Sequence, residues 1–227
     1  MKKPPPQAGC KTRILLVDDH PLTRDGIALL ISRESDLLVS AQAGTSAQAL
    51  AAVLADPPDL VVADLNLPDK GGIELIKDLK AVAPKLRVLV LSMHDEAIYA
   101  ERALRAGAAG YIMKVEGGRK LVEAIRRVLA GEIYVSAAIS SRILRGFRGQ
   151  QEVGPRALVE KLSDRELEVF RLFGTGISTS AIGDRLHLSP KTIEAHRGNI
   201  KTKLGIATAA ELISYSARWI AAEDAPK

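Results

Sequence analysis

Residues 13–130 alternate five times between a short apolar run and a longer amphipathic stretch. The apolar runs are continuous, which indicates strands buried on both faces and hence a parallel sheet with helices on each side. We expect strands at 13–17, 37–43, 59–63, 86–92 and 109–113, and helices at 21–34, 46–55, 72–82, 95–106 and 118–130. This order predicts an α/β fold, a doubly wound five-stranded parallel sheet.

The pattern changes after residue 131. No strand is expected beyond EIYV (132–135), and RGFRGQQEVGPRA (145–157) has the composition of a linker. The remainder is predicted to be all-α, with helices at 163–173, 178–186, 190–203 and 208–220. The predicted organisation is a disordered tail at 1–11, a first domain at 12–131, a linker at 132–157 and a helical domain at 158–227.

Composition narrows the class of protein. A chain of 227 residues with 47% hydrophobic and 26% charged residues can bury two modest cores. The single cysteine, Cys10, cannot form an internal disulfide. The opening MKKPPPQAGC lacks the apolar run of a secretory signal, and no run reaches the ~20 apolar residues of a membrane span. We therefore expect a cytoplasmic protein with no membrane partner.

The net charge of +5 is less informative than its distribution. Residues 185–203 hold five basic residues and a single acidic one, Glu194. Such a basic segment suggests a polyanionic partner, although a solvated helix face would have the same composition.

Polar residues stand at the ends of four predicted strands. They are Asp18 and Asp19 after the first strand, Asp64 after the third, Ser92 after the fourth, and Tyr111 and Lys114 at the fifth. In a parallel sheet these ends lie along one edge, where ligands of doubly wound folds bind. One such aspartate could simply cap a helix, and a single lysine could lie on the surface. The ordered set is much harder to obtain by chance.

Three carboxylates at one edge repel one another unless cations compensate them. Mg²⁺ prefers oxygen ligands and keeps several waters, and Lys114 adds a second positive charge. A carboxylate beside these cations is arranged to accept a phosphoryl group, whose oxygens the cations neutralise. The sequence therefore predicts a Mg²⁺-dependent phosphoryl site.

The first domain resembles the receiver domain of two-component response regulators over residues 12–131. The matching segments are LLVDDHP, VVADLNLP followed by Gly72, VLVLSMHD and GAAGYIMK. The resemblance implies that Asp64 is the phospho-acceptor, and that Lys114 is an ion pair for the phosphoryl group. It also implies that Ser92 and Tyr111 are the conformational switch, with Tyr111 turning in from solvent. The implied metal ligands are Asp19 directly, Asp18 mainly through water, Asp64, and the Asn66 backbone carbonyl. Many receivers have proline where this chain has Val115, which leaves the geometry of that peptide bond open.

Residues 162–206 resemble the LuxR-type helix-turn-helix. The first motif helix would be 178–186, the turn HLS, and the recognition helix 190–203, which would lie in the major groove. Ile193, His196, Ile200 and Leu204 are expected to face the core, so His196 is more plausibly packed than catalytic. Gly183 stands where this family usually has alanine, which would weaken the first motif helix slightly.

The recognition helix is expected to contact DNA through its exposed face. The predicted DNA-binding residues are Lys191, Thr192, Glu194, Ala195, Arg197, Gly198, Lys201 and Lys203. The four cations would mostly contact phosphates, and base reading would fall to Glu194, Ala195 and Gly198. The alternative is that Glu194 only pairs with Lys191 or Arg197 and reads no base.

Together the two resemblances imply the NarL/FixJ family of transcriptional response regulators. The implied partners are a sensor histidine kinase, promoter DNA and a second copy of the chain after phosphorylation. The dimer face is left open between the first domain and residues 208–220. A Mg²⁺-dependent phosphohydrolase is the competing class, but Asn66 stands where such enzymes usually have their general acid. We therefore expect no turnover enzyme. A third hypothesis is a regulator that responds through protein contacts and not to phosphorylation. The intact set of aspartates, Ser92 and Lys114 argues against it.

Overall fold

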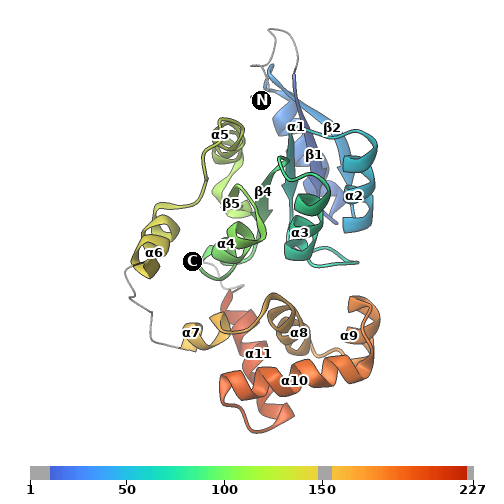
Figure 1. The fold of residues 1–227 in the computed structure, drawn as a ribbon, viewed down its shortest axis with the longest axis vertical. Coiled ribbons are helices and arrows are strands. Elements are labelled where there is room, and N and C mark those ends of the chain that lie inside the picture. The colour runs from blue at the N-terminus through green and yellow to red at the C-terminus, as the bar shows by residue number, and fades with distance from the viewer. Residues whose placement is uncertain (1–10, 148–154, 224–227) are drawn as a thin grey trace. The chain divides into compact units, whose positions relative to one another are not determined.

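A computed structural model of the chain describes residues 11–147 and 155–223, and the N-terminal tail predicted at 1–11 lies outside it except for the exposed Lys11. The described chain divides into two compact units, with the boundary between Ser140 and Ser141 (Figure 1).

The first unit is built on one parallel sheet. Its strands lie in the order β2-β1-β3-β4-β5, and all four neighbouring pairs are parallel (Figure 1). The strands are β1 (Thr12–Val17), β2 (Leu37–Ala43), β3 (Leu60–Ala63), β4 (Arg87–Ser92) and β5 (Gly110–Met113). The predicted doubly wound five-stranded sheet is confirmed.

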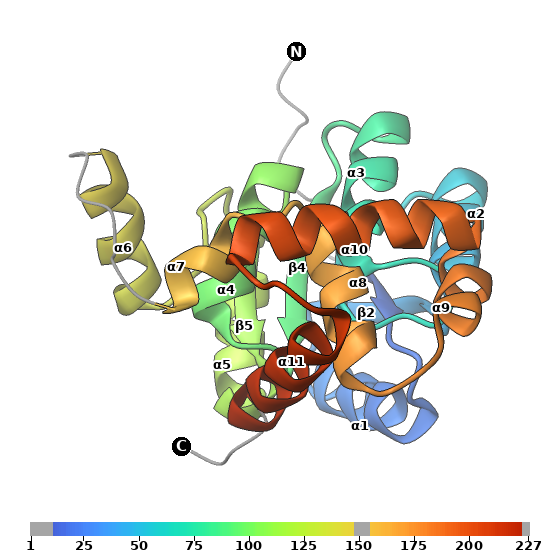
Figure 2. The ribbon, with the colours of Figure 1, turned by 90° about the horizontal axis from the view of Figure 1, so that it is seen from below.

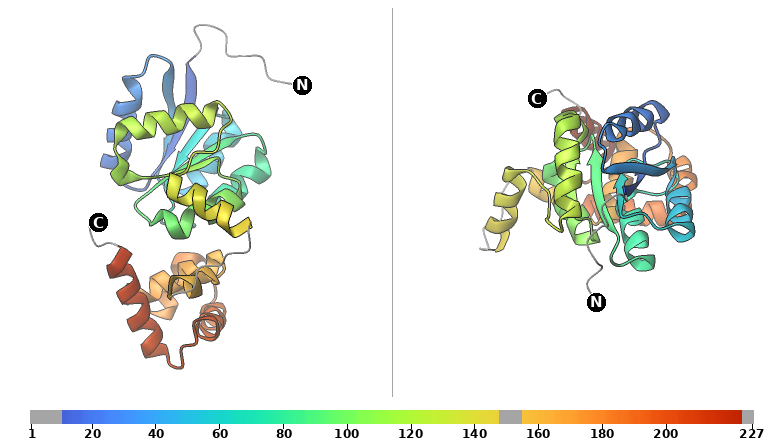
Figure 3. Two further views of the ribbon diagram at one scale, coloured as in Figure 1. Left: turned by 90° about the vertical axis from the view of Figure 1, so that its left-hand side faces the viewer. Right: turned by 90° about the horizontal axis from the view of Figure 1, so that it is seen from above.

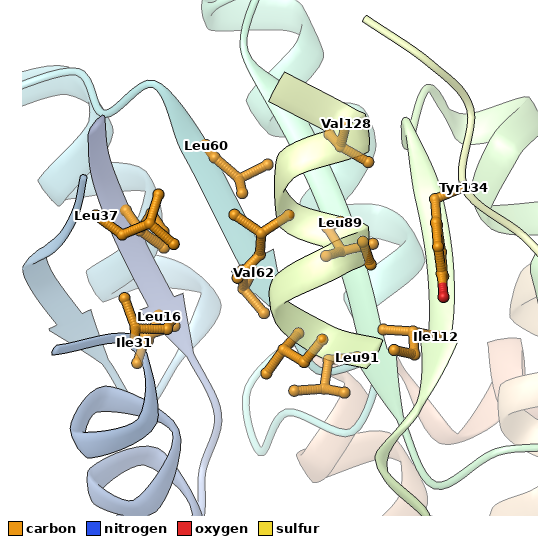
Figure 4. Packing of buried hydrophobic residues seen from close by; sticks show 14 residues of the cluster. Leu16, Ile31, Leu37, Leu60, Val62, Leu89, Leu91, Ile112, Val128 and Tyr134 are labelled. Carbon is orange, nitrogen blue, oxygen red and sulfur yellow. The ribbon is translucent and has the colours of Figure 1, made fainter. Parts of the chain in front are cut away.

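Helices cover both faces of this sheet, as the end-on view in Figure 3 makes visible. They are α1 (Pro21–Ser32), α2 (Ser46–Ala55), α3 (Gly72–Val82), α4 (Glu96–Ala106) and α5 (Gly118–Leu129), with a short 3₁₀ turn, η1 (Lys114–Glu116), after β5. Helices α1 and α5 pack on one face in a cluster with alternate strand residues, among them Leu16, Val62 and Leu89 (Figure 4). Each such side chain, when fully buried, contributes roughly 1.5–3 kcal/mol to stability. Helices α2, α3 and α4 contact one another in series and add no residue to that cluster, so they cover the opposite face.

The first part of the predicted linker, from residue 132 onward, forms a β-bridge and a helix. Tyr134 pairs with β5: its backbone N–H donates to the Ala109 carbonyl at 3.1 Å, and its carbonyl accepts from the Tyr111 N–H at 2.7 Å. A helix, α6 (Ala137–Phe147), follows, and its Ile139 is 2% exposed. The glycine- and arginine-rich composition that predicted a linker begins only at residue 145, and residues 148–154 lie outside the described chain.

The second unit is helical (Figure 2). Its helices are α7 (Pro155–Glu160), α8 (Asp164–Gly174), α9 (Thr179–Leu186), α10 (Pro190–Leu204) and α11 (Ala209–Glu223). The helix α7 was not predicted, because its six residues are too short for a periodic pattern. Helix α11 packs along α8, where Phe170 lies within 6.4 Å of the Trp219 ring and the Ser216 hydroxyl donates to the Phe170 carbonyl. Within the described residues, no helix is long and apolar enough to cross a membrane.

One glycine decides how tightly the loop after β3 can fold. A Cβ added at Gly72 would lie 2.4 Å from the Leu65 Cα and 2.6 Å from the Asp64 carbonyl oxygen. Only glycine allows this approach, which brings the first residue of α3 against the residue that ends β3.

We expect Gly72→Ala to destabilise the first unit by roughly 1–3 kcal/mol, because backbone atoms must move to admit the methyl group. Gly26→Ala is the matched control: Gly26 lies inside α1 with nothing within 4 Å of an added Cβ. The control should be neutral or stabilising by up to about 1 kcal/mol. Urea unfolding followed by circular dichroism measures both, and equal effects of the two variants would refute the packing explanation.

Candidate functional site

The ends of three strands bring two carboxylates and one ammonium together. Asp18 follows β1, Asp64 follows β3, and Lys114 follows β5. The sheet continues one residue past the strands, because the Asp64 N–H donates to the Val17 carbonyl at 2.8 Å. The parallel topology therefore fixes the backbone from which both carboxylates project.

Lys114 bridges the two carboxylates. Its Nζ lies 2.6 Å from Asp18 Oδ2 and 2.6 Å from Asp64 Oδ2. The three side chains are only 14%, 4% and 5% exposed, so their charges interact in a poorly screened environment. Burial raises the pKa of Asp64 above its ordinary value, and the Lys114 ammonium opposes that shift. Burial by itself would lower the pKa of Lys114, but the Asp64 and Asp18 carboxylates together hold it above its ordinary value.

Backbone N–H groups hold the other carboxylate oxygens. Asp64 Oδ1 accepts from the Leu65 N–H at 2.6 Å and the Asn66 N–H at 3.3 Å. Asp18 Oδ1 accepts from the His20 N–H at 2.8 Å. Each carboxylate thus directs one oxygen toward Lys114 while its other oxygen is anchored to the chain.

Asp19 supplies an oxygen with no such anchor. Its Oδ1 is buried and accepts no hydrogen bond, although His20 Nδ1 lies 2.6 Å away. Ligand atoms of Asp18, Asp19 and His20 all lie within 4.8 Å of one another. A buried carboxylate oxygen without a donor, next to a second carboxylate, is a donor set that fits a hard divalent cation such as Mg²⁺. The predicted ligand Asn66 is exposed at the start of the neighbouring loop. Sequence reasoning missed His20, whose imidazole the DDHP motif places directly after the acidic pair.

The predicted switch residues, Ser92 at the end of β4 and Tyr111 in β5, both bind His94 in the loop between β4 and α4. Ser92 is fully buried, and its Oγ accepts from the His94 N–H at 3.3 Å. Tyr111 is 1% exposed and donates its hydroxyl to the His94 carbonyl at 2.8 Å. Burial holds the pKa of Tyr111 well above its ordinary value. The expectation that this ring starts in solvent is wrong for this structure, because the His94 carbonyl gives the inward hydroxyl a partner.

Two further residues support the site and were missed from sequence. The Arg24 guanidinium donates to the Asp18 carbonyl at 2.6 Å and to Gln42 Oε1 at 2.9 Å, so it ties α1 and β2 to the residue that ends β1. Asp69 accepts from the Ser46 and Ala47 N–H groups at 2.9 and 3.0 Å, and so joins the loop after β3 to the first turn of α2. Single polar residues in a helix or loop carry no pattern that reveals such long-range partners.

Helices α9 and α10 form a tight helix-turn-helix. The turn contains His187 in the left-handed region (φ 53°), and Ser189 caps α10 by accepting from the Thr192 N–H at 3.1 Å. A Cβ at Gly183 would lie 2.7 Å from the Leu188 carbonyl oxygen. The glycine that sequence reasoning treated as a weakness is therefore needed for the close approach of this turn.

The two faces of α10 separate as predicted. Ile193, Ile200 and Leu204 are buried, and His196 is half-buried. The predicted DNA-binding residues lie on the remaining surface: Lys191, Glu194, Ala195, Gly198 and Lys203 are exposed, and Thr192, Arg197 and Lys201 are half-buried.

Two of the predicted phosphate-binding lysines are engaged within the domain. Lys203 Nζ lies 2.6 Å from Glu166 Oε2, and Lys201 Nζ donates to the Ala207 carbonyl at 2.9 Å. Glu166 is 4% exposed and also accepts from the Ser163 N–H at 2.7 Å. Burial by itself would raise the pKa of Glu166, but the bonds from Lys203 and Ser163 hold it below its ordinary value. The Lys203 ammonium therefore joins α10 to α8 in this structure, and its phosphate contact stays a prediction.

The carboxylate of Glu194 is paired with Arg197, one of the two partners that the sequence left open. Thr179 Oγ1, on the first residue of α9, lies 3.2 Å from Glu194 Oε1. The charge on Glu194 is thus compensated locally.

Comparison with known proteins agrees with both halves of the chain. The model of the response regulator receiver domain matches residues 14–126, and that of the bacterial regulatory proteins of the luxR family matches residues 160–216. The response regulator GacA of Pseudomonas aeruginosa is 34% identical over 207 residues, which cover 91% of this chain and 95% of that protein. The transcriptional activator protein ExaE of Pseudomonas putida is 36% identical over 201 residues, covering 88% and 93%. The chain is a response regulator of the NarL/FixJ family.

Solved structures agree with this assignment. RcsB from Salmonella enterica serovar Typhimurium, bound to promoter P1flhDC in the presence of the phosphomimetic BeF3-, is similar with a TM-score of 0.69 and 25% identity, over 92% of this chain and 99% of that chain. A LuxR-family response regulator from Aurantimonas sp. SI85-9A1 matches 62% of this chain and 99% of its own, with a TM-score of 0.57 and 37% identity. Like other members of its family, this response regulator combines a receiver domain with a LuxR-type DNA-binding domain.

The Lys114–Val115 peptide bond, whose geometry the sequence left open, is trans, as are all peptide bonds in the described residues.

We expect Lys114→Met to destabilise the receiver domain of this response regulator by about 3 kcal/mol at pH 7, because two buried carboxylates lose their cation. The deficit should shrink as the pH falls, since burial raises the pKa of Asp64 and its protonation removes one of the uncompensated charges. Urea unfolding by circular dichroism measures it, with fluorescence of the only tryptophan, Trp219, reporting the other domain. Lys120→Met, which removes an exposed pair with Glu116, is the control and should change the stability little, because water and salt screen that pair. A deficit that does not change with pH would contradict the electrostatic explanation.

We expect Glu166→Gln to destabilise the DNA-binding domain by roughly 1–3 kcal/mol at pH 7, because a charged acceptor is lost. The pKa of Glu166 is lowered in the folded protein, so its contribution is present above the unfolded pKa and is lost as the pH falls through the folded pKa. The difference from the unmodified protein should therefore vanish in acid. Trp219 fluorescence during urea unfolding between pH 7 and pH 3 measures this. Glu168→Gln, at the half-buried pair with Arg165, is the control and should show little change.

Proposed function

We propose that this response regulator accepts one phosphoryl group on Asp64 from a sensor histidine kinase, with Mg²⁺ bound, and then binds promoter DNA as a dimer to regulate transcription. The observation that carries the proposal is the buried arrangement of Lys114 between Asp18 and Asp64, beside an Asp19 oxygen that accepts no hydrogen bond.

The carboxylates and Lys114 have distinct roles in this proposal. Asp18, Asp19, Asp64 and the Asn66 carbonyl would hold Mg²⁺, which when bound neutralises oxygens of the phosphoryl group. Asp64 attacks phosphorus through one carboxylate oxygen, the bond from phosphorus to the donor nitrogen breaks, and the leaving imidazole keeps that electron pair and takes up a proton. Lys114 then moves its ion pair from the Asp64 carboxylate to the new phosphoryl oxygens.

The loop after β4 is positioned to transmit the change. Ser92 Oγ and the Tyr111 hydroxyl both bind the backbone of His94, through its N–H and its carbonyl. If Ser92 turns to donate to a phosphoryl oxygen, the first of these bonds breaks and the start of α4, capped by Asp95, is released. Coupling of this kind typically has a magnitude of ~1–3 kcal/mol, which suffices to favour a dimer.

Two observations support DNA as the partner of the second domain. Helix α10 begins at a capped N-terminus and presents Lys191, Glu194, Ala195 and Gly198 to solvent. The similar protein RcsB has been solved bound to promoter DNA. Asn66 stands where a phosphohydrolase would usually have its general acid. We therefore propose that the chain is a switch modified on its own aspartate and that it is not a turnover enzyme.

The test measures phosphoryl transfer to the chain together with its dimerisation and DNA binding. The full chain, incubated with Mg²⁺ and acetyl phosphate, should gain one acid-labile phosphoryl group, sediment as a dimer and bind a selected double-stranded DNA more tightly. Asp64→Asn and chelation of Mg²⁺ should each abolish the labelling. Asp25→Asn, at an exposed position on α1, is the control and should label normally. Equal labelling of Asp64→Asn would refute the acceptor assignment, and labelling without a change in DNA affinity would refute the coupling.

A further inference from the structure

Three side chains link the two helices of the helix-turn-helix. Thr179 on α9 contacts Glu194 Oε1 at 3.2 Å, and the Arg197 guanidinium pairs with Glu194 Oε2 on α10. Both oxygens of one carboxylate are therefore engaged, one from each helix.

The contact from α9 distinguishes this set from an ordinary surface ion pair. A pair at positions i and i+3 on a helix surface contributes only a few tenths of a kcal/mol. Thr179, however, approaches from another helix, and it is not needed as a cap because Ser178 accepts from the Ala181 N–H at 3.2 Å. The Thr179 hydroxyl is thus available to orient Glu194 across the turn.

The position of the guanidinium suits base recognition. Arg197 has five N–H donors, so donation to one carboxylate oxygen leaves others for acceptors. The next residue, Gly198, has nothing within 4 Å of an added Cβ, so the surface of α10 is open at that position. A guanidinium held in one plane can donate two parallel hydrogen bonds to guanine O6 and N7.

We propose that Arg197 reads a guanine in the major groove, that Glu194 positions its guanidinium, and that Thr179 positions Glu194. The proposal rests on the proposed function of α10 in DNA binding. The sequence predicted that Arg197 contacts a phosphate and that Glu194 reads a base. In the present proposal Arg197 reads the base instead, and Glu194 only positions it.

The charge of the set separates these two assignments. Because Glu194 neutralises Arg197, the pair carries no net charge and attracts phosphate weakly. The salt dependence of binding counts neutralised phosphates, so loss of a residue that contacts only a base should leave it nearly unchanged. Loss of a true phosphate contact, such as Lys191 at the exposed start of α10, should lower the slope of log K against log salt by about 0.9.

The experiment uses the full chain, treated with Mg²⁺ and acetyl phosphate, and a random library of double-stranded DNA. After selection, affinities are measured for the preferred sequence and all of its single-base variants. Arg197→Ala should reduce discrimination at one G·C pair by roughly tenfold or more, with an unchanged salt slope. Lys191→Ala should instead weaken binding to all sequences alike.

Thr179→Val tests the positioning role, since it keeps the shape and removes the hydroxyl. It should reduce discrimination at the same G·C pair by a smaller factor, and it should add nothing when Arg197 is already alanine. Ser180→Ala, at the next and exposed position of α9, is the matched control and should keep the preference. Trp219 fluorescence during unfolding checks that each variant is folded.

Three outcomes overturn the proposal. If Arg197→Ala keeps the preference but lowers the salt slope, Arg197 is a phosphate contact and Thr179 has no recognition role. If Thr179→Val weakens all sequences equally, or acts independently of Arg197, the positioning role fails. If the unmodified protein selects no sequence at all, the proposed DNA-binding function itself fails, which the first two outcomes leave intact.

Discussion

The ion pair network of Lys114 with Asp18 and Asp64 is the interaction on which the receiver domain depends. Two carboxylates that are about 95% buried would repel each other strongly without a cation between them. The sheet meets this requirement through its topology, because the ends of β1, β3 and β5 converge at one edge. The same requirement makes the site sensitive to charge, since carboxylates that must be compensated by a cation respond to any new charge placed beside them.

The DNA-binding domain uses the same principle in two places. The buried carboxylate of Glu166 is compensated by Lys203, which joins α8 to α10. The more exposed carboxylate of Glu194 is compensated by Arg197 and accepts a hydrogen bond from Thr179. Cations on α10 therefore divide between those that stabilise the fold and those that remain available for a polyanion.

Much of the receiver site could be predicted from sequence because its residues stand at strand ends. Asp18, Asp64 and Lys114 are recognisable from their place after continuous apolar runs, and a parallel sheet places such ends together. Arg24 and Asp69 could not be predicted in this way. Their partners lie 6 to 23 positions away on other elements, and nothing in the local sequence specifies which carbonyl or N–H they reach. The helix over 137–147 was missed because the composition just beyond it favoured a linker.

The sequence by itself determined the order of strands and helices around the sheet, the fold class of both domains and the residue types at the strand-end site. Hydrophobic periodicity and the residue types at strand ends are local properties, so they can be recognised from the amino-acid sequence alone. Only the tertiary structure decided which charges meet. It placed the Tyr111 hydroxyl on the His94 carbonyl, paired Lys203 with Glu166, and showed that Gly183 is required by the carbonyl of Leu188. These outcomes depend on distances of a few ångströms between elements, which packing sets and residue spacing along the chain does not encode.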